Sequence, residues 1–348
     1  MKVGHFVSLG IGGADRAAYN LAIGLKSIGS APVIFYSKNS LPTRTADQDP
    51  NQPLLNILSL YEKNFEVHQI DEGKDLNEFG LDVLHTHRSG EDHWLLPDLE
   101  SLNRQFKIVE TNFHGKLETP ADFRIFPSRA LMRWKRIRKS KSNAVIPNAI
   151  LPPLSTESFR SDLGIDPSSV VLGRLARADN SVFSPSLLRA YKYLRKKVPV
   201  SLVWVGASDQ AKRWALKLGL NEIHWVDPVR DPELVSKWMN TFDVFCHFNK
   251  LGETFGNTVA EAMMHKLPVV SLAGSLVYPQ AQREMLDSGP QFHRLGASAV
   301  AHLRKLCESD AVRAKLGEAN QKLALEQYSP EIVGRQVGDL YARVLSNL

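Results

Sequence analysis

The sequence predicts an α/β protein made of two Rossmann-like domains, each with a doubly wound parallel sheet. Short apolar runs alternate with amphipathic stretches along the chain, which is the pattern of repeated strand and helix units. The alternation stops once, at a proline-rich stretch, and then starts again. A length of 348 residues also suits two domains, because a domain commonly holds about 150 residues. We expect the two sheets to face a central cleft.

The first half of the chain opens with an apolar run at 3–9, which is typical of a buried parallel strand. A glycine turn at 10–13 follows, and a helix is predicted over 14–25 that Gly29 caps. The further strands expected in this half are 32–37, 65–70, 81–87, 107–112, 121–126 and 144–147.

The second half repeats the pattern after a predicted linker at 148–155, which holds consecutive prolines and no amphipathic period. Its expected strands are 170–173, 200–205, 222–226, 244–248 and 268–271, and its expected helices are 186–197, 211–218, 232–240 and 257–265. From residue 297 the chain is predicted to be helical to its end, with a new helix after Ser329 and Pro330.

These boundaries predict a domain over 1–150 and a second over 151–330. We expect the last helix, within 331–348, to pack back on the first domain. Two cysteines, Cys246 and Cys307, support neither a disulfide framework nor a structural zinc site. The amino terminus does not resemble a signal peptide, and no run of about 18 apolar residues could span a bilayer. The expected location is the cytoplasm, with any membrane contact peripheral, at the inner membrane face.

A net charge of +6 is too diffuse to indicate nucleic-acid binding. One segment differs from the rest: residues 129–141 hold seven basic side chains and no acidic one. On a helix, Leu131, Trp134 and Ile137 would form a narrow apolar stripe. Two interpretations follow, a docked helix with a solvated basic face or a surface for anionic lipid or an anionic acceptor.

The glycine turn at 10–13 is the first candidate binding motif. Gly12 and Gly13 let the backbone approach a ligand closely, at a helix start whose N–H groups suit an anion. A tight structural turn explains the same residues equally well.

The second and more specific motif is the stretch 252–263. The entry to its helix consists of Phe255, Gly256, Asn257 and Thr258. A helix entry of this kind suits a pyrophosphate, because the dipole and the first N–H groups favour negative charge. Glu253 and Glu261 cannot usefully face the same phosphates, so we expect them to contact the hydroxyls of a ribose and a sugar. The alternative, a loop charge and a surface helix residue, is disfavoured by the apolar neighbours Ala260 and Ala262.

These residues resemble the nucleotide-sugar signature of glycosyltransferase family 4, which comprises retaining enzymes of GT-B fold. The signature is Glu253 and Glu261, with seven residues between them, followed by Ala262-Met263 and the run 266–270. Further agreement lies at Gly12-Gly13, 82–87, 145–149, 173–175, 202–206, 328–331 and 340–341. The resemblance covers nearly the whole chain and is most specific over 170–270.

The resemblance implies a role for each matching residue. Glu261 would bind the ribose hydroxyls, and Glu253 would contact the donor sugar near its anomeric face. Residues 255–258 would hold the diphosphate and the sugar. His114 follows a strand at the place where the family keeps a histidine facing the donor sugar, although a histidine satisfied within its own loop is the alternative.

One departure from the family concerns the charge on the leaving group. Arg174 matches the arginine of a basic pair that neutralises the diphosphate, but Asp179 stands where the lysine of that pair is expected. A departing diphosphate needs positive charge when no metal supplies it. Arg177 is the nearest replacement, and loss of activity or a rearranged loop is the alternative.

A possible metal site at the end of one strand is the last motif. His85 and His87 would share one face of a strand, and acidic residues and a histidine follow at 91–93. The family carries this pattern without metal, so we expect no metal ligand and instead a role at the strand end or in the acceptor cleft.

The sequence thus predicts a metal-independent retaining hexosyltransferase without a cofactor. Its expected partners are a nucleotide diphosphate sugar, preferably a UDP-sugar, a glycan or lipid-linked acceptor on the first domain, and an anionic membrane surface at 129–141. By the resemblance, retention implies front-face attack in which the departing phosphate helps remove the acceptor proton. Two rivals remain: a relative that binds nucleotide sugars or glycans without turnover, and a dinucleotide oxidoreductase, which the lack of G-x-G-x-x-G disfavours.

Overall fold

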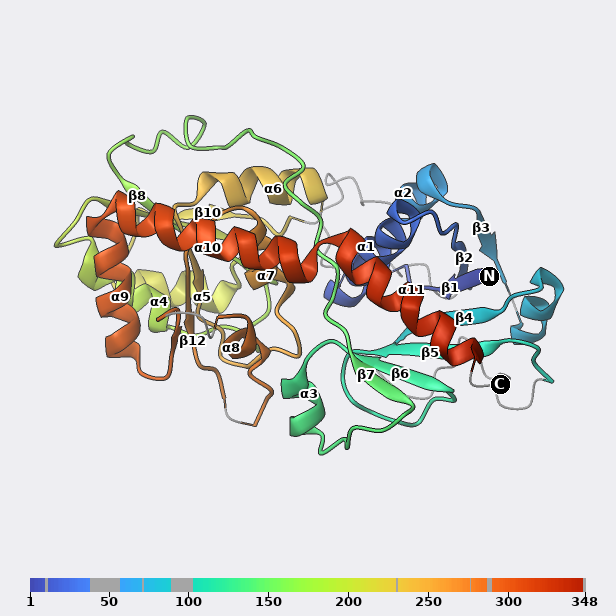
Figure 1. Ribbon diagram of the computed structural model, residues 1–348. Coiled ribbons are helices and arrows are strands. Elements are labelled where there is room, and N and C mark those ends of the chain that lie inside the picture. The colour runs from blue at the N-terminus through green and yellow to red at the C-terminus, as the bar shows by residue number, and fades with distance from the viewer. Residues whose placement is uncertain are drawn as a thin grey trace. The chain divides into compact units, whose positions relative to one another are not determined.

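A computed structural model (Figure 1) divides the chain into two compact units. The residues that it describes are 1–9, 12–37, 57–70, 72–88, 103–229, 231–275, 277–286 and 290–346. Unit 1 holds Met1–Ala149 and Tyr328–Leu348, and unit 2 holds Ile150–Gln327. The first division, after Ala149, lies inside the predicted linker. In the described part of the chain, no helix combines the length and apolar character that crossing a membrane requires.

Unit 1 is built on a parallel sheet, seven-stranded over its described residues, in the order β3-β2-β1-β4-β5-β6-β7. Its strands are β1 Val3–Phe6, β2 Val33–Tyr36, β3 Val67–Gln69, β4 Val83–Arg88, β5 Lys107–Asn112, β6 Phe123–Phe126 and β7 Asn143–Val145. The strand order reverses between β1 and β4, where His5 lies directly beside His85. In doubly wound sheets, this switch point is where ligands bind beyond the carboxyl ends of the strands.

The C-terminal helix completes the core of unit 1. The helices described in this unit are α1 Gly13–Ser27, α2 Ile57–Asn64, the 3₁₀ helix η2 Gly73–Phe79, α3 Arg129–Trp134 and α11 Pro330–Ser346. Helices α1 and α11 run side by side (Figure 1), and glycines allow their close approach. A Cβ on Gly24 would lie 2.1 Å from Pro330 O, and one on Gly334 would lie 2.5 Å from Gly24 O. Leu21 and Val337 thereby pack together on the sheet residue Val83.

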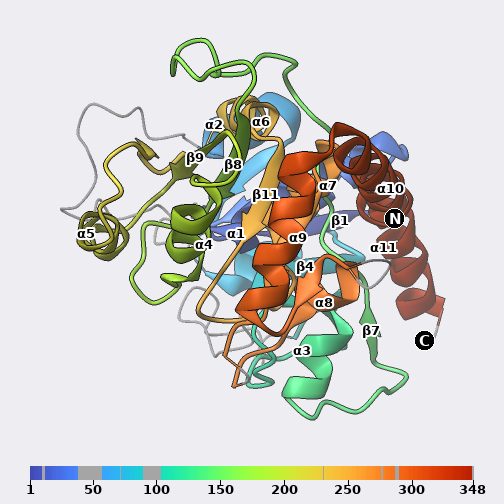
Figure 2. The same ribbon diagram turned by 90° about the vertical axis from the view of Figure 1, so that its left-hand side faces the viewer.

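Unit 2 has a second parallel sheet, six-stranded where it is described, in the order β10-β9-β8-β11-β12-β13. Its strands are β8 Val170–Leu175, β9 Val200–Val205, β10 His224–Val226, β11 Val244–His247, β12 Val269–Leu272 and β13 Phe292–His293. Its helices are α4 Ser186–Leu194, α5 Asp209–Lys217, α6 Pro232–Thr241, α7 Asn257–Met264, α8 Ala281–Met285, α9 Gly296–Glu308 and α10 Asp310–Tyr328. Helix α9 packs on β12 and β13 (Figure 2), over a core that includes Leu172, Leu202 and Val244.

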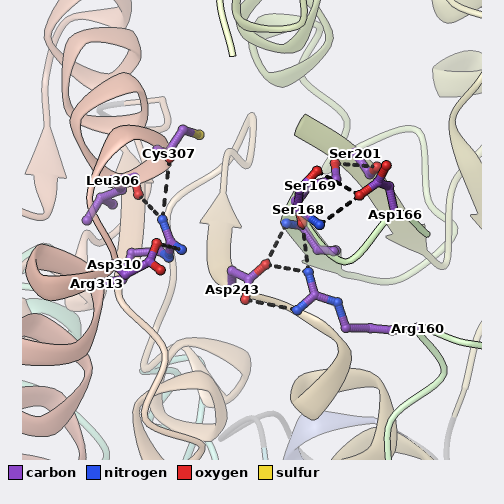
Figure 3. Close-up of polar contacts among 11 residues, drawn as sticks. Arg160, Asp166, Ser168, Ser169, Ser201, Asp243, Leu306, Cys307, Asp310 and Arg313 are labelled. Atoms are coloured by element: carbon purple, nitrogen blue, oxygen red, sulfur yellow. Dashed lines mark hydrogen bonds and ion pairs between the residues drawn. The ribbon is translucent and has the colours of Figure 1, made fainter. Parts of the chain in front are cut away.

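Two arginines fix the path of the chain in unit 2 (Figure 3). Arg160 donates to Asp243 Oδ2 and to Ser169 O, each at 2.8 Å, and so holds the segment before β8 against the start of β11. Arg313 of α10 donates to Leu306 O at 2.6 Å, which satisfies a carbonyl at the end of α9.

The two predicted parallel-sheet units are confirmed, whereas four short elements among the described residues were not predicted. These elements are α2, η2, α8 and β13. Helix α8 has five residues and β13 has two, which is too short to give a hydrophobic period, and η2 is a 3₁₀ helix. The helix predicted within 129–141 ends at Trp134, and Arg136 beyond it adopts a left-handed φ of 55°. Its apolar stripe, Leu131, Trp134 and Ile137, packs into unit 1.

Candidate functional site

The stretch 252–263 forms a rigid turn that leads from β11 into α7. Gly256 caps α7 with a φ of 104°, in the left-handed region that favours glycine. Gly252 is needed for close packing, because a Cβ there would lie 2.0 Å from Pro279 O. Glu253 O accepts a hydrogen bond from the Ala281 N–H at 3.0 Å. The amino end of α7, with the positive end of its dipole, is therefore held at the carboxyl edge of the sheet.

The other predicted residues of this stretch surround the start of α7. Phe255 is buried, which anchors the turn in the core of unit 2. Asn257 and Thr258 form the first turn of α7 and are partly buried. Glu261 follows in the second turn, also partly buried. The structure thus places these predicted residues on one short segment.

Two side chains from the end of β11 hold the Glu253 carboxylate. Asn249 Nδ2 donates to Glu253 Oε1 at 2.7 Å, and His247 Nε2 lies 3.1 Å from the same oxygen. His247 Nδ1 lies 3.0 Å from Ser271 Oγ. The Glu253 side chain is 28% exposed, whereas His247 is 2% exposed. Asn249 and His247 therefore hold Glu253 Oε1 in place, while the Glu253 side chain remains partly exposed.

Arg174, at the end of β8, lies beneath this network and is only 2% exposed. Its Nη2 donates to Asn249 Oδ1 at 2.6 Å, and its guanidinium carbon lies 4.8 Å from the centre of the Trp204 ring. Arg174 Nε has no hydrogen-bond partner among the described residues. Burial lowers the pKa of Arg174 to about 10, and Glu253 opposes this shift, so the guanidinium stays charged at neutral pH.

The loop after β8 contains the two residues that depart from the family pattern. Arg177 is exposed. Asp179 accepts from the Ser181 N–H at 2.7 Å and from the Ser181 hydroxyl at 2.8 Å, and these bonds lower the pKa of its carboxyl group. Where the family has a lysine, this chain therefore has an ionised carboxylate tied into a local turn.

The glycine turn before α1 is only partly described, since residues 10 and 11 lie outside the described ranges. Gly12 is the extended N-cap of α1, and its N–H donates to Asp15 Oδ2 at 2.9 Å. Ser8 Oγ donates to the other oxygen of Asp15 at 2.7 Å. Gly13 begins the helix. An acidic side chain of the chain itself therefore occupies the amino end of α1 in this arrangement.

His114 lies in a loop after β5 that Asn112 organises. Asn112 Oδ1 accepts from the backbone N–H of His114 at 3.3 Å and of Gly115 at 2.6 Å. The His114 residue is exposed. A Cβ on Gly115 would lie 2.4 Å from Lys135 Cγ, so this loop packs against the basic segment 129–141 within unit 1.

His85 and His87 belong to a buried chain of hydrogen bonds in unit 1, with His5 and Tyr341. His87 Nε2 lies 3.0 Å from His5 Nδ1, and His5 Nε2 lies 3.3 Å from Tyr341 Oη. Tyr341 Oη lies 2.5 Å from His85 Nδ1, and His85 Nε2 lies 2.8 Å from Thr111 Oγ1. With neutral imidazoles, each ring donates from one nitrogen and accepts at the other. Residues 91–93 lie outside the described ranges.

The three histidines of this hydrogen-bond network are near enough to one another to be considered as metal ligands. One nitrogen from each of His5, His85 and His87 lies within 4.8 Å of the others. The rings of His85 and His87 are stacked, however, 4.4 Å apart and only 18° from parallel. Their lone pairs lie in the ring planes and therefore run side by side instead of meeting at one ion. The ring arrangement fits the hydrogen-bond chain better than a metal.

Sequence reasoning did not identify Asn249 or His247. The available signal was a pair of polar side chains at the end of the apolar strand β11, at the sheet edge where α/β proteins bind ligands. A histidine and an asparagine at such a place also occur for structural reasons alone. Only their contacts with Glu253 and Arg174 reveal them as part of the site.

Comparisons with known proteins concern the segment that contains this stretch and the fold of the chain. Residues 166–286, which contain the whole stretch 252–263, match the family model "Glycosyl transferases group 1". No curated protein is similar enough in sequence to match the chain.

Solved structures share the fold over the whole chain. A glycosyltransferase from Rickettsia africae has a TM-score of 0.76 at 14% identity, covering 100% of this chain and 99% of that protein. Anabaena HepE in complex with UDP and glucose has a TM-score of 0.71 at 16% identity, and sucrose-phosphate synthase from Thermosynechococcus elongatus has 0.70 at 14%. For both, all of each chain is covered. The fold is GT-B, as predicted, and together with the family match it supports a glycosyltransferase.

Proposed function

We propose that this chain is a retaining glycosyltransferase that moves a hexose from a nucleotide diphosphate sugar to a glycan or lipid-linked acceptor. The observation that carries the proposal is the fixed Glu253 carboxylate beside the amino end of α7, in the segment that matches the family model. A UDP-sugar is the favoured donor. Anabaena HepE, which shares the fold, is solved with UDP and with UDP-glucose.

The donor would bind along the start of α7. The helix dipole and the backbone at residues 255–258 suit the diphosphate. Glu261, one turn further, would accept hydrogen bonds from the ribose hydroxyls, and Glu253 would contact the hydroxyls of the sugar. In this arrangement the protein positions the sugar and stabilises charge, while the departing phosphate takes the acceptor proton.

Positive charge for the leaving diphosphate would come from protein side chains without a metal. Arg174 supplies a permanent charge from below the site, and Arg177 is exposed on the neighbouring loop. The turn of Asp179 with Ser181 supports the alternative function, a relative that binds nucleotide sugars or glycans with weakened turnover, because the family's lysine charge is replaced by a carboxylate.

The acceptor would bind to unit 1, near the turn of Gly12 and Gly13 and the exposed His114. The basic segment 129–141 adjoins the His114 loop, and Arg133, Arg136 and Arg138 are exposed on it. We propose that it holds the protein to an anionic membrane surface, since each cation near such a surface contributes roughly 1 kcal/mol. Salt-sensitive sedimentation with phosphatidylglycerol vesicles that Arg133→Glu/Arg136→Glu abolishes would support this role. Sedimentation that is absent, or that ignores salt and charge, would contradict it.

Nucleotide titration tests the donor site directly. UDP, GDP and ADP are titrated against the wild type, Glu261→Ala and the control Glu318→Ala, an exposed helix position in unit 2. Loss of a charged acceptor for the ribose should weaken binding by roughly 1.5–3 kcal/mol. Unchanged affinity for the best nucleotide would remove Glu261 from the site.

The stereochemistry of transfer tests the activity itself. Incubation of the wild type with a UDP-hexose and a glycan acceptor, followed by NMR of the new glycosidic bond, should show the anomeric configuration of the donor. An inverted product would overturn the retaining mechanism. Binding of a nucleotide without any transfer or hydrolysis would favour the weakened relative.

A further inference from the structure

Asn249 stands between the two charged groups of the proposed donor site. Its Oδ1 accepts from the buried Arg174 guanidinium at 2.6 Å, and its Nδ2 donates to Glu253 Oε1 at 2.7 Å. The orientation of the amide follows from its neighbours, because a guanidinium can only donate and a carboxylate can only accept. The amide dipole is therefore aligned from a buried cation to a surface anion.

The chemistry of an amide fits this bridge. A carboxylate at position 249 would pair with Arg174 but would face Glu253 as a second anion. An apolar side chain would leave a fully buried guanidinium without its hydrogen bond, which is costly in a low-dielectric interior. The amide accepts on one side and donates on the other.

The bridge also selects which Glu253 oxygen meets the substrate. Asn249 Nδ2 and His247 Nε2 both approach Oε1, at 2.7 and 3.1 Å. The side chain of Glu253 is nevertheless 28% exposed. Oε1 is thus held by the protein, which leaves Oε2 as the oxygen available to a ligand.

We infer that Asn249 is a positioning residue that orients the Glu253 carboxylate by linking it to the buried guanidinium of Arg174. This inference rests on the proposed function, and it assigns Arg174 an action through Asn249. Arg174 is buried below the site, so its charge reaches the sugar end of the donor through the amide and Glu253. Misplacement of a reacting group by about 1 Å can cost about 100-fold in rate.

Steady-state kinetics with a UDP-sugar separate positioning from binding. Asn249→Leu should lower kcat by about 100-fold while KM changes by less than about threefold, and Asn249→Gln, which keeps the amide, should restore part of kcat. Asn249→Asp, whose carboxylate cannot donate to Glu253 Oε1, should lower kcat at least as much as Asn249→Leu. The control is Asn221→Asp, the same charge change at an exposed position of unit 2.

A second measurement does not depend on activity. The ¹³C chemical shift of the Glu253 carboxyl group, assigned with Glu253→Gln, is compared at one pH in the wild type, Asn249→Leu and Asn221→Asp. It should move in Asn249→Leu, which loses the hydrogen bond to Oε1, and stay in place in Asn221→Asp. An unmoved signal, or full kcat in Asn249→Leu, would overturn the inference. A wild type without transfer or hydrolysis, but with the moved signal in Asn249→Leu, would instead overturn the proposed function and leave the coupling standing.

Discussion

Each unit holds a polar network on its parallel sheet, but the two networks differ in charge. The unit 1 network joins His5, His85, His87 and Tyr341, all of them buried. The unit 2 network joins a buried cation to a partly exposed carboxylate through Asn249. Burial holds the pKa of His5 down to about 3 and the pKa values of His85 and His87 well below the usual range. One network is neutral and closed, and the other is charged and open.

Because of this difference, we expect the two networks to have different roles. A closed neutral chain satisfies buried polar groups and ties α11, through Tyr341, to β1 and β4, so its effect is on the stability of unit 1. An open charged network ends on an oxygen that can meet a ligand, so its effect is on binding and rate. Breaking each network should therefore change a different measurement.

The largest expected effect is a loss of stability of unit 1 in acid. Above pH 6.5 the histidines are neutral in both states, and this effect is absent. As the pH falls below 6.5, the unfolded chain takes up protons that the buried rings do not, His5 down to about pH 3, so unfolding becomes favoured. Each ring that stays neutral costs about 1.4 kcal/mol per pH unit, or about 2 kcal/mol at pH 5.

Urea unfolding between pH 7.5 and pH 5 measures this effect. His5→Gln, which cannot be protonated, should lower the stability at pH 7.5 yet flatten its dependence on pH. His68→Gln makes the same substitution at a partly exposed histidine of unit 1 and serves as the control. If the free energy of unfolding depended on pH equally in the wild type and in His5→Gln, the buried histidine network would not exclude protons.

Glu253→Gln should break the open network at its functional end. The substitution keeps the size of the side chain and removes its charge, so transfer should fall by about 10²–10³-fold while the affinity for free nucleotide stays nearly normal. Calorimetric titration with UDP and a transfer assay check the two parts, with Glu318→Gln as an exposed control. Equal losses in both assays would move Glu253 to nucleotide binding.

Tyr341→Phe should remove the hydrogen bonds that connect the unit 1 network to α11. It leaves His5 and His85 each without one partner, and we expect the free energy of unfolding to fall by about 1–2 kcal/mol. The matched control is Tyr61→Phe, since the Tyr61 hydroxyl is buried and has no partner among the described residues. Its removal should be neutral or stabilising. If Tyr341→Phe and Tyr61→Phe lowered the free energy of unfolding equally, the hydrogen bonds of Tyr341 would add no stability beyond packing.

The contrast between the networks also shows what the sequence could predict. The two parallel sheets follow from apolar runs and turn residues, which act locally and leave a periodic pattern. The turn at Gly252 and Gly256 and the two glutamates were found for the same reason, since they lie within one short stretch. Asn249 bonds Arg174, which is 75 positions away in the sequence, and Glu253, which is four positions away. The contact of Tyr341 with His85 spans 256 positions. Such contacts depend on tertiary packing, which no local pattern encodes.

Removal of metal ions should have the smallest effect, and it tests both networks at once. Parallel stacking of His85 and His87 disfavours a shared ion, and the unit 2 network already contains the buried positive charge of Arg174. We therefore expect dialysis against EDTA to leave both the melting temperature and the turnover with a UDP-sugar unchanged. A fall in melting temperature that Zn²⁺ reverses, and that His87→Gln no longer shows, would make the unit 1 network a metal site. A loss of turnover that Mn²⁺ restores, at constant melting temperature, would instead show that the charge in unit 2 is insufficient without an ion. Because the two failures differ in readout, this experiment identifies which side of the comparison is wrong.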